Sequence, residues 1–177
     1  MTTLRPFRIS DLLKFNNVNL DPLTENYGLN FYAQYLIQWP QYFQVAESAS
    51  GQIMGYIMGK IDSGATGRSG HVTAVTVAPQ YRRLGLAGAL MQQLETIADR
   101  QRCAFVDLFV RVSNAVAITM YERLGYVVYR RILDYYSGSV DTQEDAFDMR
   151  KSLSMDPDKR CMVPLKHPVK IDEYNLE

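Results

Sequence analysis

The segment Val75–Gly88 combines residue types that suit the binding of a phosphate group. It has an apolar, strand-like run, then two arginines, Arg82 and Arg83, and then a stretch of small residues from Gly85 onward. The first turn of a helix leaves about four N–H groups without partners and carries the positive end of the helix dipole. Small side chains let a phosphate approach these groups, and the arginines add positive charge. We therefore predict an anion site at this turn.

The alternative for this segment is a plain turn followed by a helix of small residues packed on a sheet. The arginines, the small residues and the apolar strand occur together, which favours the binding site over that alternative. The segment lacks the GxxxxGK[ST] pattern of a Walker loop and the GxGxxG pattern of a dinucleotide-binding turn.

Apolar periodicity, caps and turn residues predict the elements that would position this turn. Ser10 and Ser113 are expected to cap two of the helices, and a glycine-rich loop is expected over 63–70. Strands that alternate with helices indicate an α/β (α+β) fold with a mixed sheet. The expected strands are 3–8, 42–47, 52–61, 71–78, 104–110, 126–133 and 145–153, and the expected helices are 11–19, 31–39, 86–100 and 114–124.

The length of 177 residues suits one domain over 1–153 and an extended or partly disordered tail over 154–177, where proline recurs and periodicity is lost. The formal net charge of zero argues against broad binding to nucleic acid or to an anionic membrane. Cys103 and Cys161 have no metal-like spacing, so we expect two reduced thiols and no metal site. No signal peptide or membrane helix is evident, so we expect a soluble, cytoplasmic protein.

The pattern R-x-x-G-x-A after a strand resembles the acyl-CoA loop of the GCN5-related N-acetyltransferases (GNAT). Asn114-Ala-Val-Ala, Tyr121 and Leu124-Gly-Tyr resemble that family too. The resemblance implies acetyl-CoA as cofactor, and a GNAT fold whose mixed, mostly antiparallel sheet has splayed parallel strands and about four flanking helices. The cofactor-binding residues that it implies are Val75, Thr76, Val77, Arg82, Arg83, Gly85, Leu86, Ala87, Gly88, Asn114 and Tyr121.

Four further segments look like the protein N-terminal acetyltransferases, and together like the catalytic subunits of N-terminal acetyltransferase B: 16–27, 71–75, 107–114 and Tyr135-Tyr136. The tail is similar through Pro164-Leu165 and His167-Pro168-Val169. This resemblance implies acetylation of nascent proteins whose initiator Met is followed by Asp, Glu, Asn or Gln. It also implies a helical-repeat auxiliary subunit that docks the enzyme on the ribosome.

Neither cysteine lies in the matching segments, so we expect direct transfer of the acetyl group in a ternary complex and not an acyl-cysteine intermediate. A free α-amino group has a pKa of about 7.7–8.0, so about a tenth is neutral near pH 7 and only modest base assistance is needed. A backbone N–H near Val77 would stabilise the oxyanion, and Tyr121 would protonate the departing thiolate. The resemblance implies these two roles, and His71 and Glu25 are the other catalytic candidates.

The peptide would lie against residues from several segments. Leu23 and Phe109 would hold the Met side chain, and the tyrosines would form a lid. His71, neutral or charged, would donate to the second residue. Without the resemblance, Glu25 could be a solvated loop charge, His71 a structural histidine and the tyrosines ordinary surface or core aromatics. The implied substrate residues are Leu23, Glu25, Tyr27, His71, Thr73, Ala74, Phe109, Asn114, Tyr135 and Tyr136.

Two other functions remain open from the residues alone: an acetyltransferase for a lysine side chain or small amine, and a non-catalytic acyl-CoA-binding subunit. A lysine amine, with a pKa of about 10.4, would need a stronger base. Apolar residues of the first two expected helices could contact the auxiliary subunit or pack in the core. They are Leu12, Phe15, Phe31, Tyr35, Leu36 and Trp39.

Overall fold

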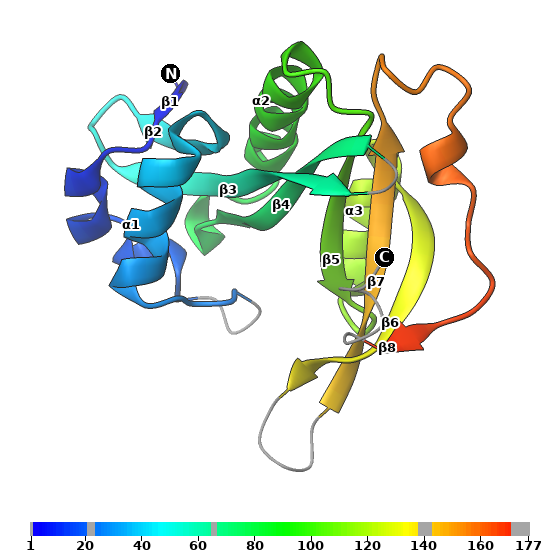
Figure 1. Cartoon of the computed structure of the whole chain (residues 1–177). Coiled ribbons are helices and arrows are strands. Elements are labelled where there is room, and N and C mark those ends of the chain that lie inside the picture. The colour runs from blue at the N-terminus through cyan, green and yellow to red at the C-terminus, as the bar shows by residue number, and fades with distance from the viewer. Residues whose placement is uncertain (1, 21–23, 65–66, 138–142, 171–177) are drawn as a thin grey trace. The chain divides into compact units, whose positions relative to one another are not determined.

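The computed structural model describes residues 2–20, 24–64, 67–137 and 143–170 (Figure 1). Eight strands, three α-helices and five 3-10 helices make up this part of the chain. In chain order they are β1 (Thr2–Pro6), η1 (Ile9–Leu13), η2 (Asn16–Val18), α1 (Leu29–Gln38), η3 (Pro40–Tyr42), β2 (Phe43–Ser48), β3 (Ile53–Gly64), β4 (Gly67–Val77), η4 (Pro79–Tyr81), α2 (Leu86–Arg100), β5 (Phe105–Arg111), α3 (Ala115–Arg123), β6 (Val127–Ser137), β7 (Gln143–Ser152), η5 (Arg160–Met162) and β8 (Val169–Lys170).

The strands follow the hydrogen-bonded order β1-β2-β3-β4-β5-β7-β6-β8. The pairs β1–β2, β2–β3, β5–β7 and β6–β7 are antiparallel, whereas β6–β8 is parallel. This mixed sheet, combined with helices, confirms the predicted fold class.

The chain forms two compact units. The N-terminal unit comprises Met1–Ile61 and Val72–Ile97, and the C-terminal unit comprises Asp62–His71 and Ala98–Glu177. Strands β3 and β4 therefore contribute residues to both units.

The core of the N-terminal unit is built mainly from aromatic side chains. Phe7 stacks on Phe43 with ring centroids 3.9 Å apart, and Phe15 meets Tyr32 edge to face at 5.2 Å. Such edge-to-face and offset contacts add to the energy gained by burying the rings. The core holds α1 against β2 and β3, and thereby positions the segment that precedes α1.

The expected helix 11–19 is wrong, since the structure has the short 3-10 helices η1 and η2 there. The reason is the buried carboxylate of Asp11, which accepts from the Arg8 N–H at 2.8 Å and pairs with Arg5 at 2.7 Å. Arg8 is therefore the N-cap, and Ser10 lies inside η1. This leaves three α-helices in the described residues, against about four expected.

The apolar residues expected at a partner surface lie mostly in the core. Phe15 and Tyr35 are buried, and the other four are partly buried against the same cluster. A different set of large apolar residues on the first helical segments is exposed: Ile9, Leu13, Leu20, Leu29 and Ile37.

The C-terminal unit is organised around β5, β6 and β7. The β6–β7 pair reaches from Val127↔Arg150 to Ser137↔Gln143, and Figure 1 shows this pair extending past the end of β5. The expected loop 63–70 is largely wrong, because β3 continues to Gly64 and β4 begins at Gly67.

The described part of the tail, through Lys170, has hydrogen-bonded structure of its own. The Asp156 carboxylate accepts from the backbone N–H groups of Arg160 and Cys161, which fixes η5. The Leu165 N–H then donates to the Tyr129 carbonyl at 2.7 Å, and β8 pairs with β6. Proline removed the periodic signal from this segment, but backbone pairing and a capping carboxylate order it.

Candidate active site

The turn before α2 has the backbone geometry of an anion site. Arg83 and Gly85 have positive φ angles of 64° and 77°, and the helix begins at Leu86. The Ala89 N–H donates to the Gly85 carbonyl at 3.0 Å. The amides immediately before Ala89 therefore have no acceptor within the helix and carry the positive end of its dipole.

The surroundings of this turn fit a diphosphate group. Arg82, Arg83 and Gly85 are exposed, whereas Leu86 is buried and anchors the first helical turn. A Cβ atom placed on Gly85 would have no atom within 4 Å, so the approach to the backbone is open. Backbone amides, two guanidinium groups and open space together suit the anionic part of acetyl-CoA.

The strand end that leads into this turn is closely packed. Thr76 Oγ1 lies 3.0 Å from Thr24 Oγ1, and Arg82 Nε donates to the Val77 carbonyl at 3.3 Å. The side chain of Arg82 therefore folds back toward β4. Val75 and Val77 are partly buried, and Thr76 is buried.

Gly55 on β3 is a residue that the sequence analysis missed. A Cβ atom at this position would lie 2.7 Å from the Thr76 carbonyl oxygen and 3.2 Å from the Val77 Cα. Beside it, the Ala78 N–H donates to the Met54 carbonyl at 2.8 Å. Only glycine permits this approach of β3 to the predicted cofactor strand. The one available signal was a glycine inside a strand pattern, which often marks a close backbone approach.

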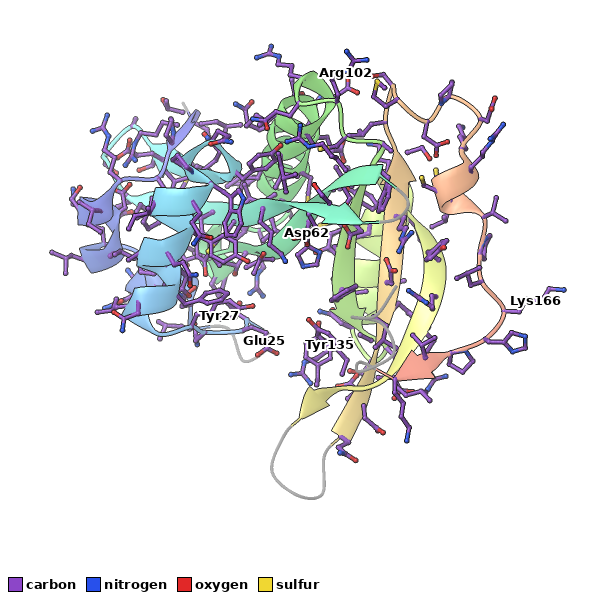
Figure 2. The ribbon with its side chains drawn as sticks, in the orientation of Figure 1. Glu25, Tyr27, Asp62, Arg102, Tyr135 and Lys166 are labelled. Carbon is purple, nitrogen blue, oxygen red and sulfur yellow. The ribbon has the colours of Figure 1, made fainter. Side chains whose placement is uncertain are left out.

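Part of the predicted peptide site lies in the N-terminal unit. The Tyr27 hydroxyl is 3.5 Å from the Thr73 carbonyl oxygen, and the Tyr35 hydroxyl lies 2.8 Å from Thr73 Oγ1. Figure 2 shows Glu25 and Tyr27 on the same segment before α1, and Glu25 is exposed. Ala74 packs against the aromatic core. Leu23 lies outside the described residues.

The rest of the predicted peptide site forms a row of rings in the C-terminal unit. His71 lies 5.1 Å from Phe109, Phe109 lies 4.9 Å from Tyr135, and Tyr135 lies 4.9 Å from Tyr136, all between ring centroids and all edge to face. The Tyr136 hydroxyl donates to the Phe109 carbonyl at 3.3 Å. We call these four residues the aromatic row. Strands β4, β5 and β6 bring them together.

Arg111 and Glu144 hold one end of the aromatic row. The Arg111 guanidinium lies 4.1 Å from the centroid of the Tyr136 ring and donates to Glu144 at 3.1 Å. Glu144 also accepts from the Ser113 N–H at 2.9 Å. The hydrogen bonds from Ser113 and then the pairing with Arg111 hold the pKa of Glu144 below its usual range. Sequence reasoning did not identify this pair.

The C-terminal unit, which contains His71, also has buried charged residues, among them Asp107, Asp148 and Arg150. His71 Nδ1 is 2.9 Å from Asp107 Oδ2, and Asp107 is buried. Asp148 is fully buried and pairs with Arg150 at 3.0 Å. Burial raises the pKa of Asp148 to about 6, despite the opposing effect of Arg150. Arg150 in turn lies 3.5 Å from the centroid of the Tyr129 ring.

Helix α3 carries the remaining two predicted residues. The N-cap is Asn114 and not Ser113 as expected, because the Asn114 side chain accepts from the Ala117 N–H at 3.2 Å. Its side-chain oxygen is therefore engaged in capping. Tyr121 is buried, and burial raises the pKa of its hydroxyl. Gly125, with φ of 93°, follows the end of the helix as predicted.

The predicted site residues are divided between the two units. The turn before α2 and the end of β4 belong to the N-terminal unit, whereas α3 and the aromatic row belong to the C-terminal unit. Among the described residues, no three His, Cys, Asp or Glu side chains gather in a group that could hold a metal ion. None of the described helices is long and apolar enough to cross a membrane.

The model of the Acetyltransferase (GNAT) family matches residues 11–126. The chain belongs to this family. It is 55% identical over 178 residues to the N-terminal acetyltransferase B complex catalytic subunit NAA20 of Arabidopsis thaliana, with 100% of both chains covered. It is 52% identical over 164 residues to the corresponding subunit naa20 of Schizosaccharomyces pombe, covering 92% of this chain and 91% of that protein.

Solved structures agree with this assignment. Chaetomium thermophilum Naa20 in complex with a bisubstrate analogue is similar with a TM-score of 0.89 and 45% identity, over 96% of this chain and 97% of that chain. A chain of the NatB acetyltransferase complex bound to CoA and MES is similar with a TM-score of 0.78 and 46% identity, over 85% and 99%. The predicted GNAT fold, the acetyltransferase class and the use of acetyl-CoA are confirmed, while the roles of individual residues stay predictions.

Proposed function

We propose that this GNAT acetyltransferase is the catalytic subunit of an N-terminal acetyltransferase B, and that it acetylates proteins beginning Met-Asp, Met-Glu, Met-Asn or Met-Gln. The observation that carries the proposal is the aromatic row with His71 at one end. Rings suit the apolar Met side chain and the peptide backbone. A histidine beside them suits a second residue that is acidic or an amide. The high identity to NAA20 proteins supports the same function.

Acetyl-CoA held at the turn before α2 would supply the acetyl thioester that a neutral α-amine attacks. The chain contributes mainly by positioning, since holding the two reactants in contact supplies much of the rate. We assign the Val77 N–H to the acetyl oxygen, where a fixed donor stabilises developing negative charge. Glu25, exposed on the segment before α1, is the candidate to orient the amine or to take its proton through water.

Tyr121 would act at the leaving group. Its buried hydroxyl has a raised pKa, so it stays protonated throughout the working pH range. A thiol has an ordinary pKa of about 8.5, below that of tyrosine at about 10, so a thiolate would not take the Tyr121 proton completely. We therefore assign Tyr121 the donation of a hydrogen bond to the departing sulfur, in place of full proton transfer.

Tyrosines of each unit are the proposed contacts of the peptide N-terminus. Tyr27, beside Thr73, would contribute from the N-terminal unit. Tyr135 and Tyr136 would contribute from the C-terminal unit, where Phe109 contacts both. Their hydroxyl groups can donate to backbone carbonyls of the peptide. With Leu23, Phe109 would receive the Met side chain.

The exposed apolar face of the first helical segments would bind the auxiliary subunit. We define this face by Ile9, Leu13, Leu29 and Ile37, which are 65–86% exposed. Large apolar side chains with this much exposure become favourable when a partner protein covers them. A helical-repeat subunit offers an extended apolar surface of that kind. Such a complex would act in the cytoplasm at the ribosome. Leu13→Asp with Ile37→Asp should abolish co-purification of the two subunits, and retained co-purification would place the interface elsewhere.

A peptide panel tests the proposed activity. Peptides that differ only in the second residue are incubated with acetyl-CoA, and acetylated product is measured by mass spectrometry. Product from the Met-Asp, Met-Glu, Met-Asn and Met-Gln peptides, with little from Met-Lys or Ser-Asp peptides, is expected. The control peptide has a blocked N-terminus and an internal lysine. Acetylation of that control alone would favour a lysine acetyltransferase, and CoA binding without any product would favour a binding subunit.

A further inference from the structure

We infer that His71 and Asp107 form a protonation-dependent selector for the second residue of the substrate. In its charged form, His71 donates from Nε2 to the carboxylate of Asp or Glu. In its neutral form, Nε2 carries a lone pair that accepts from the amide of Asn or Gln and disfavours a carboxylate. This inference rests on the proposed function and adds a positioning residue, Asp107, and a pH dependence to it.

The inference starts from the contact between His71 and Asp107. His71 Nδ1 lies 2.9 Å from Asp107 Oδ2, and the two side chains are only 13% and 7% exposed. An ionised carboxylate accepts hydrogen bonds and cannot donate them, so it requires the hydrogen on Nδ1. A neutral imidazole carries one N–H group. With Nδ1 as the donor, Nε2 holds a hydrogen only when His71 is charged.

This contact changes the prediction made from sequence. A histidine free to choose its tautomer could donate from the substrate-facing nitrogen in either charge state. Asp107 removes that choice, because it fixes the tautomer of the neutral ring. Asp107 also stabilises the charged ring by its proximity. The neutral and charged forms of His71 should therefore recognise different second residues.

Strands β7, β6 and β3 carry further charged residues that bear on the titration of His71. On β7, Arg150 lies directly across from Asp107 in the strand register, and Asp148 lies two residues before Arg150 on the same strand. On β6, Arg130 pairs in register with Asp148. Strand β3, next to β4 in the sheet order, carries Lys60 and Asp62.

Three neighbouring residues, Arg150, Phe109 and Asp148, affect the His71–Asp107 pair or its test. Arg150 carries a positive charge directly across from Asp107 in the strand register. Phe109 meets the imidazole edge to face at 5.1 Å and limits its rotation. Asp148, whose pKa burial raises to about 6, titrates close to the range of an ordinary histidine. The test must therefore separate His71 from Asp148.

A competition between two peptides, combined with a direct titration of His71, provides that separation. Met-Asp and Met-Asn peptides of otherwise identical sequence are acetylated together by the full-length chain from pH 6 to pH 9. The substrate Asp, with an ordinary pKa of about 3.9, stays ionised throughout. The α-amine is the same group in both peptides, so its titration affects the ratio of their kcat/KM values little, whereas the titration of Asp148 is separated from that of His71 by following His71 itself. We expect this ratio to fall with rising pH, by up to about tenfold per pH unit above the His71 midpoint.

The protonation of His71 can be followed directly. The chain contains two histidines, so in His167→Ala the remaining histidine signals in an NMR titration belong to His71. His167 lies in the tail, apart from the predicted site residues, and its replacement should leave the ratio unchanged. The midpoint from NMR should equal the midpoint of the ratio. In Asp107→Asn, both midpoints should move down by about one pH unit or more, because the negative charge is lost.

The outcomes are distinct. A ratio that stays constant from pH 6 to pH 9, or midpoints that disagree, would overturn the inference. Unchanged midpoints in Asp107→Asn would exclude the role of Asp107. If Asp107→Asn fails to fold, as judged by circular dichroism, the His71 titration and the ratio in the chain with native Asp107 decide the matter. If neither peptide is acetylated, the proposed function fails, and the NMR titration still tests the contact between His71 and Asp107.

Discussion

Gly55→Ala should damage the cofactor site through the backbone of β4. The new Cβ would lie 2.7 Å from the Thr76 carbonyl oxygen, which is 0.7 Å short of the 3.4 Å at which ordinary contact begins. The contact is with backbone, so no flexible side chain can move aside. The two strands must therefore separate next to Val77, whose N–H we assign to the acetyl oxygen.

The cost of this separation can be worked out from the neighbouring hydrogen bond. The Ala78 N–H donates to the Met54 carbonyl at 2.8 Å. A displacement of 0.7 Å along that direction would stretch it to about 3.5 Å, beyond the usual range. Overpacking of this kind costs about 1–3 kcal/mol in the free energy of unfolding. Misplacing a reacting group by about 1 Å can cost about 100-fold in rate, so we expect kcat/KM to fall by about tenfold or more.

Gly64→Ala is the matched control for Gly55→Ala. Gly64 lies on the same strand, and a Cβ atom there would meet nothing within 4 Å. Urea denaturation of both variants measures stability, and calorimetric titration with CoA measures cofactor affinity. Gly64→Ala should match the original chain in both. If Gly55→Ala also kept its CoA affinity and its free energy of unfolding, the close approach of β3 to β4 would have no role in forming the site.

Two further predictions concern the cofactor turn and the leaving group. Arg82→Ala should weaken CoA binding by about fivefold or more because a charge-assisted phosphate contact is lost. Arg100→Ala, at the other end of α2, should bind CoA as the original chain does. If calorimetry gave Arg82→Ala the CoA affinity of the original chain, the placement of the diphosphate would be contradicted. Tyr121→Phe should lower kcat by about tenfold or more with little change in peptide KM. The control is Tyr126→Phe, at the buried ring next to Tyr121, which should keep the original kcat. An unchanged kcat in Tyr121→Phe would exclude a role of the Tyr121 hydroxyl at the leaving group.

The elements around the predicted cofactor turn could be recognised from the sequence because their signals are local. The apolar stripe of α2 predicts its bounds, 86–100, as the structure has them. The arginines and the glycine of the preceding turn lie within the four residues from Arg82 to Gly85. Gly85 has a positive φ, and such a turn can be recognised from a glycine next to a helix start. A short segment carried all the necessary information.

The N-terminal segment shows where local signals fail. Ser10 followed by spaced apolar residues is a reasonable helix start, but the Asp11 side chain is drawn to Arg5, which also pairs with Glu47 at 2.7 Å. Burial by itself raises the pKa of Asp11, but the hydrogen bonds from Arg5 and the Arg8 backbone outweigh it and lower the pKa overall. The Arg5–Glu47 pair joins β1 to β2 and holds the Arg5 guanidinium where it meets Asp11, and no short window of sequence contains that pair.

Asp107 is a second residue whose partner is distant in the sequence, so local patterns did not identify it. In the sequence it is a single acid within the apolar run 104–110, where the pattern indicates only a buried strand. A buried carboxylate is costly unless it is paired, so its presence in a central strand requires a partner. That partner is His71, 36 residues earlier on β4. A charged residue inside an apolar strand is therefore a better indicator of function than its neighbours, because packing alone gives no reason for it.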